Sequence, residues 1–536
     1  MTESAKVKNN LVDRVINYFD PIRGAHRQRA RSFMALTGAY TGALLARRTL
    51  GSWATIPQDA DSALLPDLQV LRERSRDLVR NNPLGTGALN TAVTNVVGTG
   101  LKLQARPDRE ILNMADEEAD QWEANVEREF RMWSTNPQYC DIRKTLAFVD
   151  QQDLVFRQTL ENGDVFTLMA REDSKEFPYS LRLQIIEADR VCNKGEVKDT
   201  ETLCAGVEKE ASGAPKNYHI MNQHPGNWIY RSGYTWTVVP AFGEKSGLRN
   251  VIHNFRTLRP GQTRGVPWLT PVIETLKQLG RYTDAEVMGA VISALFTVFI
   301  KTEGPYPTLG PMQGDASVSG SVTTQDTDLK LGNGALIGLR PNESIEIADP
   351  KRPNTAFDGF IKAILEQVGV ALEIPFEILI GHFSASYSAS RAALLEAWRF
   401  FRGRRRWLAS SYCRPVYENF LAEGIALGRI HAPGFFSDPL LQSAYCGALW
   451  IGDAPSQINP VDEVNAAEKR LELCLSTLDE ETTNMTGGDF ETNYPRIKRE
   501  REMLKQIGMW PPPGKTLAPG TERTVDKPMM GKEMQE

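Results

Sequence analysis

The sequence has 536 residues, of which 41% are hydrophobic and 24% are charged, the composition of an ordinary globular protein with several domains. That composition excludes collagen-like, wholly disordered and disulfide-scaffold proteins. Lysine and arginine number 62 against 67 aspartates and glutamates, so the net charge of −5 excludes a nucleic-acid binder that is basic overall.

Residues 1–60 are predicted to form a basic N-terminal arm. Apolar residues at helical spacing between positions 8 and 20 predict a short amphipathic helix that ends at Pro21. The stretch that follows holds six arginines up to Arg48 and no acidic residue. Such an arm can contact phosphates or acidic protein, or it can be a solvated, partly flexible leader. The first 30 residues lack the apolar core and cleavage pattern of a secretion signal.

The next 200 residues predict a domain of the α+β class. Helical spacing covers residues 62–95, with an interruption at Pro83, and covers residues 112–133. From Val165 to about Phe255 the pattern alternates as in β-strands, with turn residues between the alternating segments. No regular βαβ repeat is visible.

The middle of the chain predicts two helical rods that flank a small irregular module. Thr270 as an N-cap followed by proline opens a helix from 270 to 300, which would be about 45 Å long. Residues 301–350 are rich in proline, glycine and polar residues and contain the hairpin signal Asn333-Gly334. A second amphipathic helix is predicted from 357 to 372.

A long helix from about 389 to 427 carries the candidate contact residues. The segment before it combines small residues with two aromatic ones: His382, Phe383, Ser384, Ser386, Tyr387 and Ser388. On the helix, one stripe consists of Arg391, Arg399, Arg402 and Arg406. The stripe beside it is apolar and must be buried, so the arginines lie at the rim of that burial. They are placed to contact a phosphate backbone, an acidic neighbouring subunit or acidic residues of the same chain.

No catalytic or metal-binding motif is present in the sequence. Gly514-Lys515-Thr516 lacks the earlier glycine at P-loop spacing and follows three prolines, which remove backbone N–H groups. HExxH, GxSxG and GxGxxG are all missing. The cysteines show no metal-ligand spacing, and we predict reduced thiols, with a Cys192–Cys204 disulfide as the alternative. We therefore expect no enzyme, no cofactor and no metal.

The longest uncharged apolar run, residues 287–300, has 14 residues. A membrane-spanning helix needs about 20. The run therefore predicts burial against protein, with no membrane partner. Further along, Pro460 opens another helix, and the last 25 residues, which include three consecutive prolines, predict a flexible tail.

Six short strings occur together over about residues 60–500. In chain order they are Ala63-Leu64-Leu65-Pro66, Leu78-Val79-Arg80-Asn81-Asn82, Gly261-Gln262-Thr263-Arg264-Gly265, Tyr387-Ser388-x-x-Arg391 with Glu396-x-Trp398 and Gly403-Arg404-Arg405, Trp450-Ile451-Gly452, and Leu475-Ser476-Thr477. In these strings and their order, the sequence resembles the portal proteins of tailed bacteriophages, lambda type. The first 55 and last 30 residues match no part of the family pattern, and Cys474 stands where relatives tend to have glycine.

The resemblance implies an α+β portal fold with a wing, a two-helix stem, a clip and a helical crown. Such chains assemble as a ring, usually a dodecamer, at one unique capsid vertex. Double-stranded DNA passes through the central channel during packaging and ejection, without sequence-specific contacts. The implied partners are the terminase large subunit, the major capsid protein and then a head–tail adaptor protein. Assembly in the host cytoplasm and a place in the virion are also implied.

The resemblance also divides the chain into parts. These are 1–60, the N-terminal arm; 61–265, the wing; 266–300, the descending stem helix; 301–350, the clip; 351–375, the ascending stem helix; 376–390, a tunnel loop; 391–449, a long wing helix and return; 450–505, the crown; and 506–536, the tail. The residues from His382 to Ser388 would face DNA. The four arginines would contact a neighbouring subunit or phosphate. Two alternatives are a packaging-motor ATPase, disfavoured by the missing P-loop, and a membrane pore built from 287–300.

Overall fold

The computed structural model describes residues 18, 21, 55–173, 175–228, 233–294, 298–302, 343–347, 357–382, 386–455, 459–507 and 509. The chain divides into two compact units, Met1–Ala63 and Leu64–Glu536. Most of the predicted N-terminal arm, the Asn333-Gly334 hairpin, Gly514-Lys515-Thr516 and the tail beyond 509 lie outside the described residues. The six cysteines are all described and form no disulfide, in agreement with the predicted thiols.

Six helices lie in the first half of the described chain: α3 (Ala60–Asn81), α4 (Pro83–Val96), α5 (Arg109–Leu112), α6 (Asp116–Thr135), α7 (Pro137–Cys140) and α8 (Phe148–Asn162). Asparagine or aspartate caps mark the starts of three of them, α4, α5 and α7. Asn82 separates α3 from α4, and its side-chain oxygen accepts hydrogen bonds from the N–H groups of Leu84 and Gly85, each at 3.0 Å. The predicted interruption at Pro83 is therefore confirmed.

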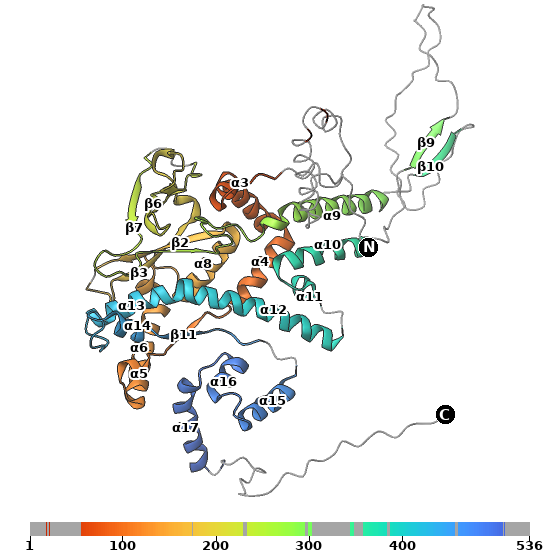
Figure 1. Ribbon diagram of the computed structural model, residues 1–536. Helices are drawn as coiled ribbons and strands as arrows, with labels where there is room; N and C mark the ends of the chain where they lie inside the picture. Colours follow the sequence, from red (N-terminus) through yellow and green to blue (C-terminus); the bar gives the residue numbers. More distant parts are fainter. Residues whose placement is uncertain are drawn as a thin grey trace, which may run out of the picture. The chain divides into compact units, whose positions relative to one another are not determined.

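Two antiparallel sheets follow, within the predicted strand region (Figure 1). The three-stranded sheet has the order β3-β2-β8, from β2 (Asp164–Arg171), β3 (Leu181–Glu187) and β8 (Val251–Phe255). The four-stranded sheet has the order β4-β5-β6-β7, from β4 (Leu203–Cys204), β5 (Val207–Lys209), β6 (Pro215–Met221) and β7 (Trp236–Pro240). The short 3-10 turns η2 (Ala188–Arg190) and η3 (Lys194–Glu196) follow β3. The α+β class is thus confirmed.

The first predicted rod is shorter than expected. A 3-10 turn, η4 (Thr270–Val272), leads into α9 (Ile273–Ala294), and Leu269 rather than Thr270 is the N-cap. A strand, β9 (Val298–Thr302), follows and pairs antiparallel with β10 (Glu343–Ile347). The prediction of one helix from 270 to 300 is therefore wrong at its end, and the 22 residues of α9 span about 33 Å. A run rich in Val, Phe and Ile is equally suited to a strand.

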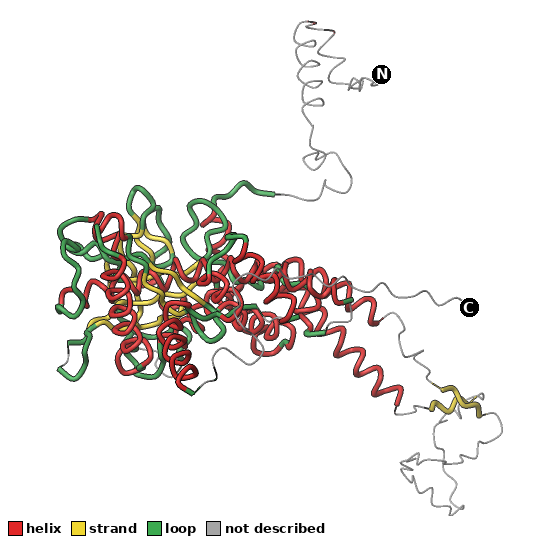
Figure 2. Tube along the Cα trace, turned by 90° about the horizontal axis from the view of Figure 1, so that it is seen from below, coloured by secondary structure: helices red, strands yellow, loops and turns green. Residues whose placement is uncertain are grey.

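The second rod is confirmed as α10 (Phe357–Leu372). It lies beside α9, as the two views in Figures 1 and 2 agree. The Tyr282 ring on α9 packs on Phe357 and Phe360 of α10, with centroid separations of 5.7 and 5.2 Å. Aromatic contacts therefore hold the two rods together.

The long helix predicted from 389 to 427 is present with an irregular middle. After α11 (Phe376–Ile380), α12 (Tyr387–Leu408) continues through a π-helical turn (Ala409–Cys413) into α13 (Arg414–Ala426). Its buried side packs into the main core. There Tyr412 stacks on Phe148, which contacts Phe130, and Phe420 contacts Trp133. This core joins α6 and α8 to the long helix and so fixes its position.

The last part of the described chain is helical. It contains α14 (Pro439–Tyr445), β11 (Ala448–Ile451), α15 (Pro460–Glu472), α16 (Leu478–Thr486) and α17 (Phe490–Gln506), and β11 pairs with β1 (Lys102–Ala105). The helix predicted at Pro460 is confirmed. Arg106, which directly follows β1, forms ion pairs with Asp479 of α16 at 3.1 Å and Glu491 of α17 at 2.6 Å. It therefore joins these two helices to β1. Among the described residues, no helix combines the length and the apolar character that crossing a bilayer requires.

Candidate functional site

The segment predicted as a loop from 376 to 390 is partly helical. It contains α11 and the first turn of α12, so only the residues between 381 and 386 separate two helices. Gly381 ends α11 with φ of 65°, a left-handed conformation that suits glycine. His382 is exposed, and its N–H donates to the carbonyl oxygen of Glu377 at 3.1 Å. The prediction of a loop from 376 to 390 is therefore wrong at 376–380 and from 387 onward, where the chain is helical.

The other predicted loop residues are placed only in part. Ser386 and Ser388 are exposed, with hydroxyl oxygens 3.2 Å apart. Tyr387 begins α12. Phe383 and Ser384 lie outside the described residues. The structure thus brings two of the predicted hydroxyl groups together at the start of α12.

The four arginines of the predicted stripe, Arg391, Arg399, Arg402 and Arg406, are all exposed on α12, whereas Phe401 and Leu408 of the neighbouring stripe are buried. Arg399 forms an ion pair of 3.1 Å with Glu396 on the same helix. Within the described part of the chain, no ion pair engages the other three arginines. A single exposed ion pair contributes little to stability. The stripe is therefore mostly available for contact outside the chain.

The neighbouring Arg405 has the opposite role. It donates to the backbone carbonyl oxygens of Asn95 at 3.1 Å, Val96 at 3.0 Å and Asp453 at 2.8 Å. Gly452 packs directly on it, because a Cβ atom there would lie 2.7 Å from the guanidinium carbon. Arg405 therefore ties the end of α4 and the segment after β11 to α12. Two of the strings that carry the family resemblance, at 403–405 and 450–452, meet in this joint.

Arg264, in a third string, is a buried structural arginine. Its Nε and one Nη donate to the Asp164 carboxylate at 2.5 and 3.3 Å, and the remaining N–H groups donate to carbonyl oxygens of Ala188, Val191 and Ala205. All five donors of this guanidinium therefore have acceptors. The sequence alone does not indicate this role, because the partners of Arg264 lie 59 to 100 residues away along the chain.

Asp164 is completely buried and is shared with a second arginine. Arg72 on α3 donates to it at 2.6 Å, and His253 on β8 lies 3.2 Å away. Burial alone would raise the pKa of Asp164, but the charges of Arg264 and Arg72 lower it well below its usual range. Burial lowers the pKa of His253 to about 4, so the imidazole is neutral at pH 7.

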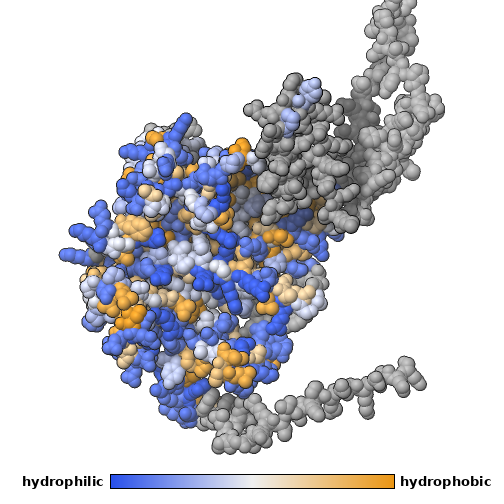
Figure 3. Space-filling view, in the orientation of Figure 1, coloured by the Kyte–Doolittle hydropathy of each residue, from blue (hydrophilic) through white to orange (hydrophobic). Residues whose placement is uncertain are grey.

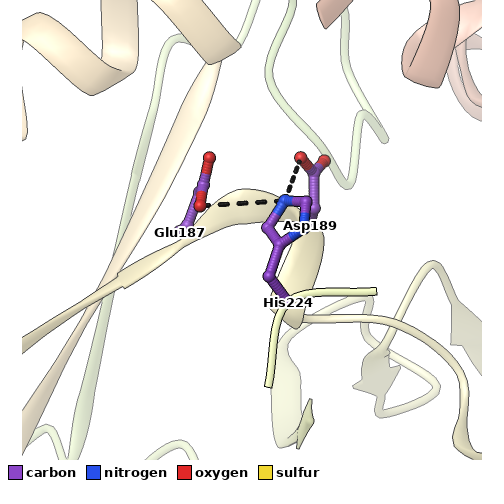
Figure 4. Close-up of side chains that lie close together, drawn as sticks. All are labelled: Glu187, Asp189 and His224. Carbon is purple, nitrogen blue, oxygen red and sulfur yellow. Dashed lines mark hydrogen bonds and ion pairs between the residues drawn. The ribbon is translucent and has the colours of Figure 1, made fainter. Parts of the chain in front are cut away.

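A group of possible metal ligands lies at the edge of this network. Glu187, Asp189 and His224 place one ligand atom each within 4.8 Å of one another (Figure 4). Arg76 contacts Asp189 at 2.6 Å and Glu187 at 3.1 Å, and Arg72 contacts Asp189 at 3.2 Å. Burial would raise the pKa of Asp189, but these arginines outweigh it and lower the pKa. The carboxylates are therefore already neutralised by arginine, which opposes cation binding.

Large apolar side chains are exposed along the rods. Val287 and Met288 on α9 are 64% and 60% exposed, and Val370 on α10 is 82% exposed. Elsewhere, the apolar residues visible in Figure 3 form separate patches among hydrophilic ones. These exposed positions on α9 fall within the apolar run 287–300. The sequence predicted this run to be buried against protein, but within the single chain Val287 and Met288 are not buried.

Comparison with known proteins places the chain in context. The family described as phage portal protein, lambda family, matches residues 46–405. Portal protein B of Escherichia phage lambda is 24% identical over 488 residues, covering 86% of this chain and 89% of that protein. The portal protein of Escherichia phage N15 is 25% identical over 485 residues, with the same coverage.

Solved structures of gene transfer agent particles are also similar to this chain. A chain of the neck of a native particle, computed with C12 symmetry, has a TM-score of 0.41 and 14% identity, covering 82% of this chain and 97% of that chain. A chain of the native virion has a TM-score of 0.41 and 13% identity, covering 78% and 92%.

Proposed function

This chain belongs to the lambda family of phage portal proteins, and we propose that it forms the ring at the unique capsid vertex through which double-stranded DNA is packaged and ejected. In this proposal the ring is a dodecamer in the virion, assembled in the host cytoplasm. It has no catalytic role and no cofactor. DNA passes through the ring without sequence-specific contacts.

The observation that carries the proposal is the exposed apolar surface on α9. Val287, Met288 and Val291 are all about half exposed or more. They remain exposed although α9 already packs against α10. A lone chain has no use for this surface, because each exposed apolar side chain gives up hydrophobic free energy. A ring requires two different contact patches on every subunit, and an exposed helix face supplies one of them.

The parts of the chain receive roles in the same proposal. Residues 61–265 form the wing, α9 descends through the stem to the clip at 301–350, and α10 ascends. The pair β9–β10 stands where the chain enters and leaves the clip. Residues 391–449 form the long wing helix and return, and 450–505 form the crown.

Contacts with the outside follow from these roles. The connection from His382 to Ser388 faces the DNA, and the arginines Arg391, Arg399, Arg402 and Arg406 brace neighbouring subunits. The ring docks the terminase large subunit during packaging and a head–tail adaptor afterwards, and it contacts the major capsid protein at the vertex. Exposure of the four arginines and of His382 supports these assignments.

The decisive experiment is the oligomeric state of the purified full chain. We expect mass photometry to find a species of about 720 kDa, twelve copies of a 59.8 kDa chain. Negative-stain electron microscopy of that species should show rotational symmetry and a central hole. Monomers or dimers at every protein and salt concentration would refute the proposal. ATP hydrolysis by the purified chain would favour the packaging-motor alternative instead.

A further inference from the structure

A groove of about 680 Å³ lies between α10, α11 and the first half of α12. Its floor is apolar, with Ile374, Phe376 and Phe400, and Val370 stands exposed at its edge. Its charged lining is mainly acidic: Glu366, Glu373, Glu377 and Glu396, against Arg399 alone. The groove therefore suits a partner with an apolar centre and a basic rim.

Glu396 is paired with Arg399 at 3.1 Å, but the other three acidic residues of the groove are only weakly engaged within the described part of the chain. Lys362 lies 4.0 Å from Glu366, and Arg256 and Arg404 lie 3.8 and 3.9 Å from Glu373, all at the outer limit of an ion pair. Glu377 has no ion pair within the described part of the chain. The side chains of Glu366 and Glu373 are more than half exposed. Closer basic partners could therefore pair with these carboxylates.

The outer face of α12 has the complementary arrangement. Leu395 is 61% exposed at its centre. At 100° per residue, Arg391, Arg399, Arg402 and Arg406 all lie within about 40° of it around the helix. Phe400, in the groove, lies about 140° from Leu395 by the same rule. Arg399 also lines the groove, so the two surfaces adjoin there, whereas Leu395, Arg402 and Arg406 do not line the groove.

We propose that the acidic groove of one subunit receives the α12 arginine face of the next subunit in the ring. The inference rests on the proposed ring and assigns two of its contacting surfaces. Leu395 would meet Val370 and the apolar floor, and Arg402 and Arg406 would meet Glu366 and Glu377. An apolar centre with a charged rim is the usual anatomy of a protein interface.

Charge complementarity selects a second copy of this chain as the occupant. The groove repels a phosphate backbone, so it is no DNA site. Two different patches that fit one another generate a closed ring rather than a two-fold dimer. The seam also explains why the arginines of α12 are exposed in the single chain, without requiring that they bind DNA in the channel.

Charge reversal tests the seam in the full-length chain. Arg402→Glu with Arg406→Glu, and separately Glu366→Arg with Glu377→Arg, should each reduce the fraction of ring in mass photometry by about tenfold or more, which corresponds to about 1.4 kcal/mol. Combining all four substitutions should restore ring formation to within about threefold of the wild type. Glu373 is left unchanged because it also faces Arg256 and Arg404.

A matched control changes the same amount of charge elsewhere. Lys102→Glu with Arg128→Glu alters two exposed residues outside the seam and should leave ring formation unchanged. Far-ultraviolet circular dichroism and the melting temperature verify that each variant is folded. Rings of normal abundance in either reversed pair, or no recovery in the fourfold variant, would overturn the seam while leaving the ring itself intact. A wild-type chain that forms no ring overturns both the seam and the proposed function.

Discussion

Buried and exposed arginines have different roles in this chain. Arg264 and Arg405 are surrounded by carbonyl and carboxylate oxygens, so each acts as a rigid cross-link between distant segments. Losing such a side chain would leave buried acceptors without donors, at a cost of several kcal/mol. Arg402 and Arg406 are exposed, and changing them should alter contacts between molecules rather than folding.

The buried pair His253 and Asp164 predicts a specific pH dependence. The unfolded chain binds a proton at this histidine near its ordinary pKa of 6.5, whereas the folded chain binds it only near 4. The contribution to stability is therefore complete above pH 6.5 and is lost as the pH falls toward 4, by up to about 3 kcal/mol. Asp164, Arg264 and Arg72 are the charged groups that face this imidazole.

The measurement compares wild type with His253→Gln in urea unfolding between pH 4 and 7.5. The substitution loses the stacking of His253 on Phe166, so it should be less stable at pH 7. Its stability should nevertheless decline less than that of wild type as the pH falls. Parallel pH profiles for the two proteins would show that the imidazole does not titrate as described. Other groups, such as Glu127, whose pKa burial raises to about 7, are common to both proteins and cancel in the difference.

At the scale of elements, helices with a clear apolar stripe could be predicted from the sequence. The stripe from 357 to 372 and the break at Pro83 both appear where expected. The end of α9 could not be predicted, because an apolar run without polar interruptions has no period that separates helix from strand. Beyond α9 the chain forms the strand β9 instead, which pairs with β10. The paired residues Thr302 and Glu343 are 41 positions apart in the sequence.

The candidate site shows the same division. The exposed stripe on α12 follows from helical periodicity alone. The acidic groove does not, because its carboxylates come from α10, the residue that follows it, α11 and α12, and converge only in the folded chain. The buried roles of Arg264 and Arg405 likewise depend on partners far away in sequence.

The connection between α11 and α12 predicts a variant that separates assembly from DNA handling. Replacing Phe383 and Tyr387 with alanine should leave ring formation unchanged, because the proposed role of these residues is to face DNA. The packaging of DNA into capsids, or its retention there, should change instead. Mass photometry of the purified variant and the DNA content of assembled particles are the two readouts. Loss of the ring would assign these residues to a subunit contact.

At the scale of the whole molecule, the net charge of the proposed ring affects how easily DNA could pass through it. Twelve copies of a chain with net charge −5 would carry about −60. Every phosphate that a basic wall neutralises releases counterions and adds affinity, so a strongly basic channel would hold the DNA that it must pass. Placing the exposed arginines of α12 in the subunit seam resolves this conflict, since their charge is then used between chains.

If the arginines lie in the seam, the assembled ring should bind a DNA duplex only weakly. Filter binding of a short DNA duplex, measured between about 50 and 200 mM salt, should show low affinity, a shallow salt dependence and no preference between sequences. The fourfold charge-swapped variant should behave like wild type, because it retains the same net charge and the same seam. Tight binding with a steep salt dependence that disappears in this variant would instead mean that Arg402 and Arg406 line the channel. In that case the arginines contact DNA, and the channel is basic although the chain as a whole is acidic.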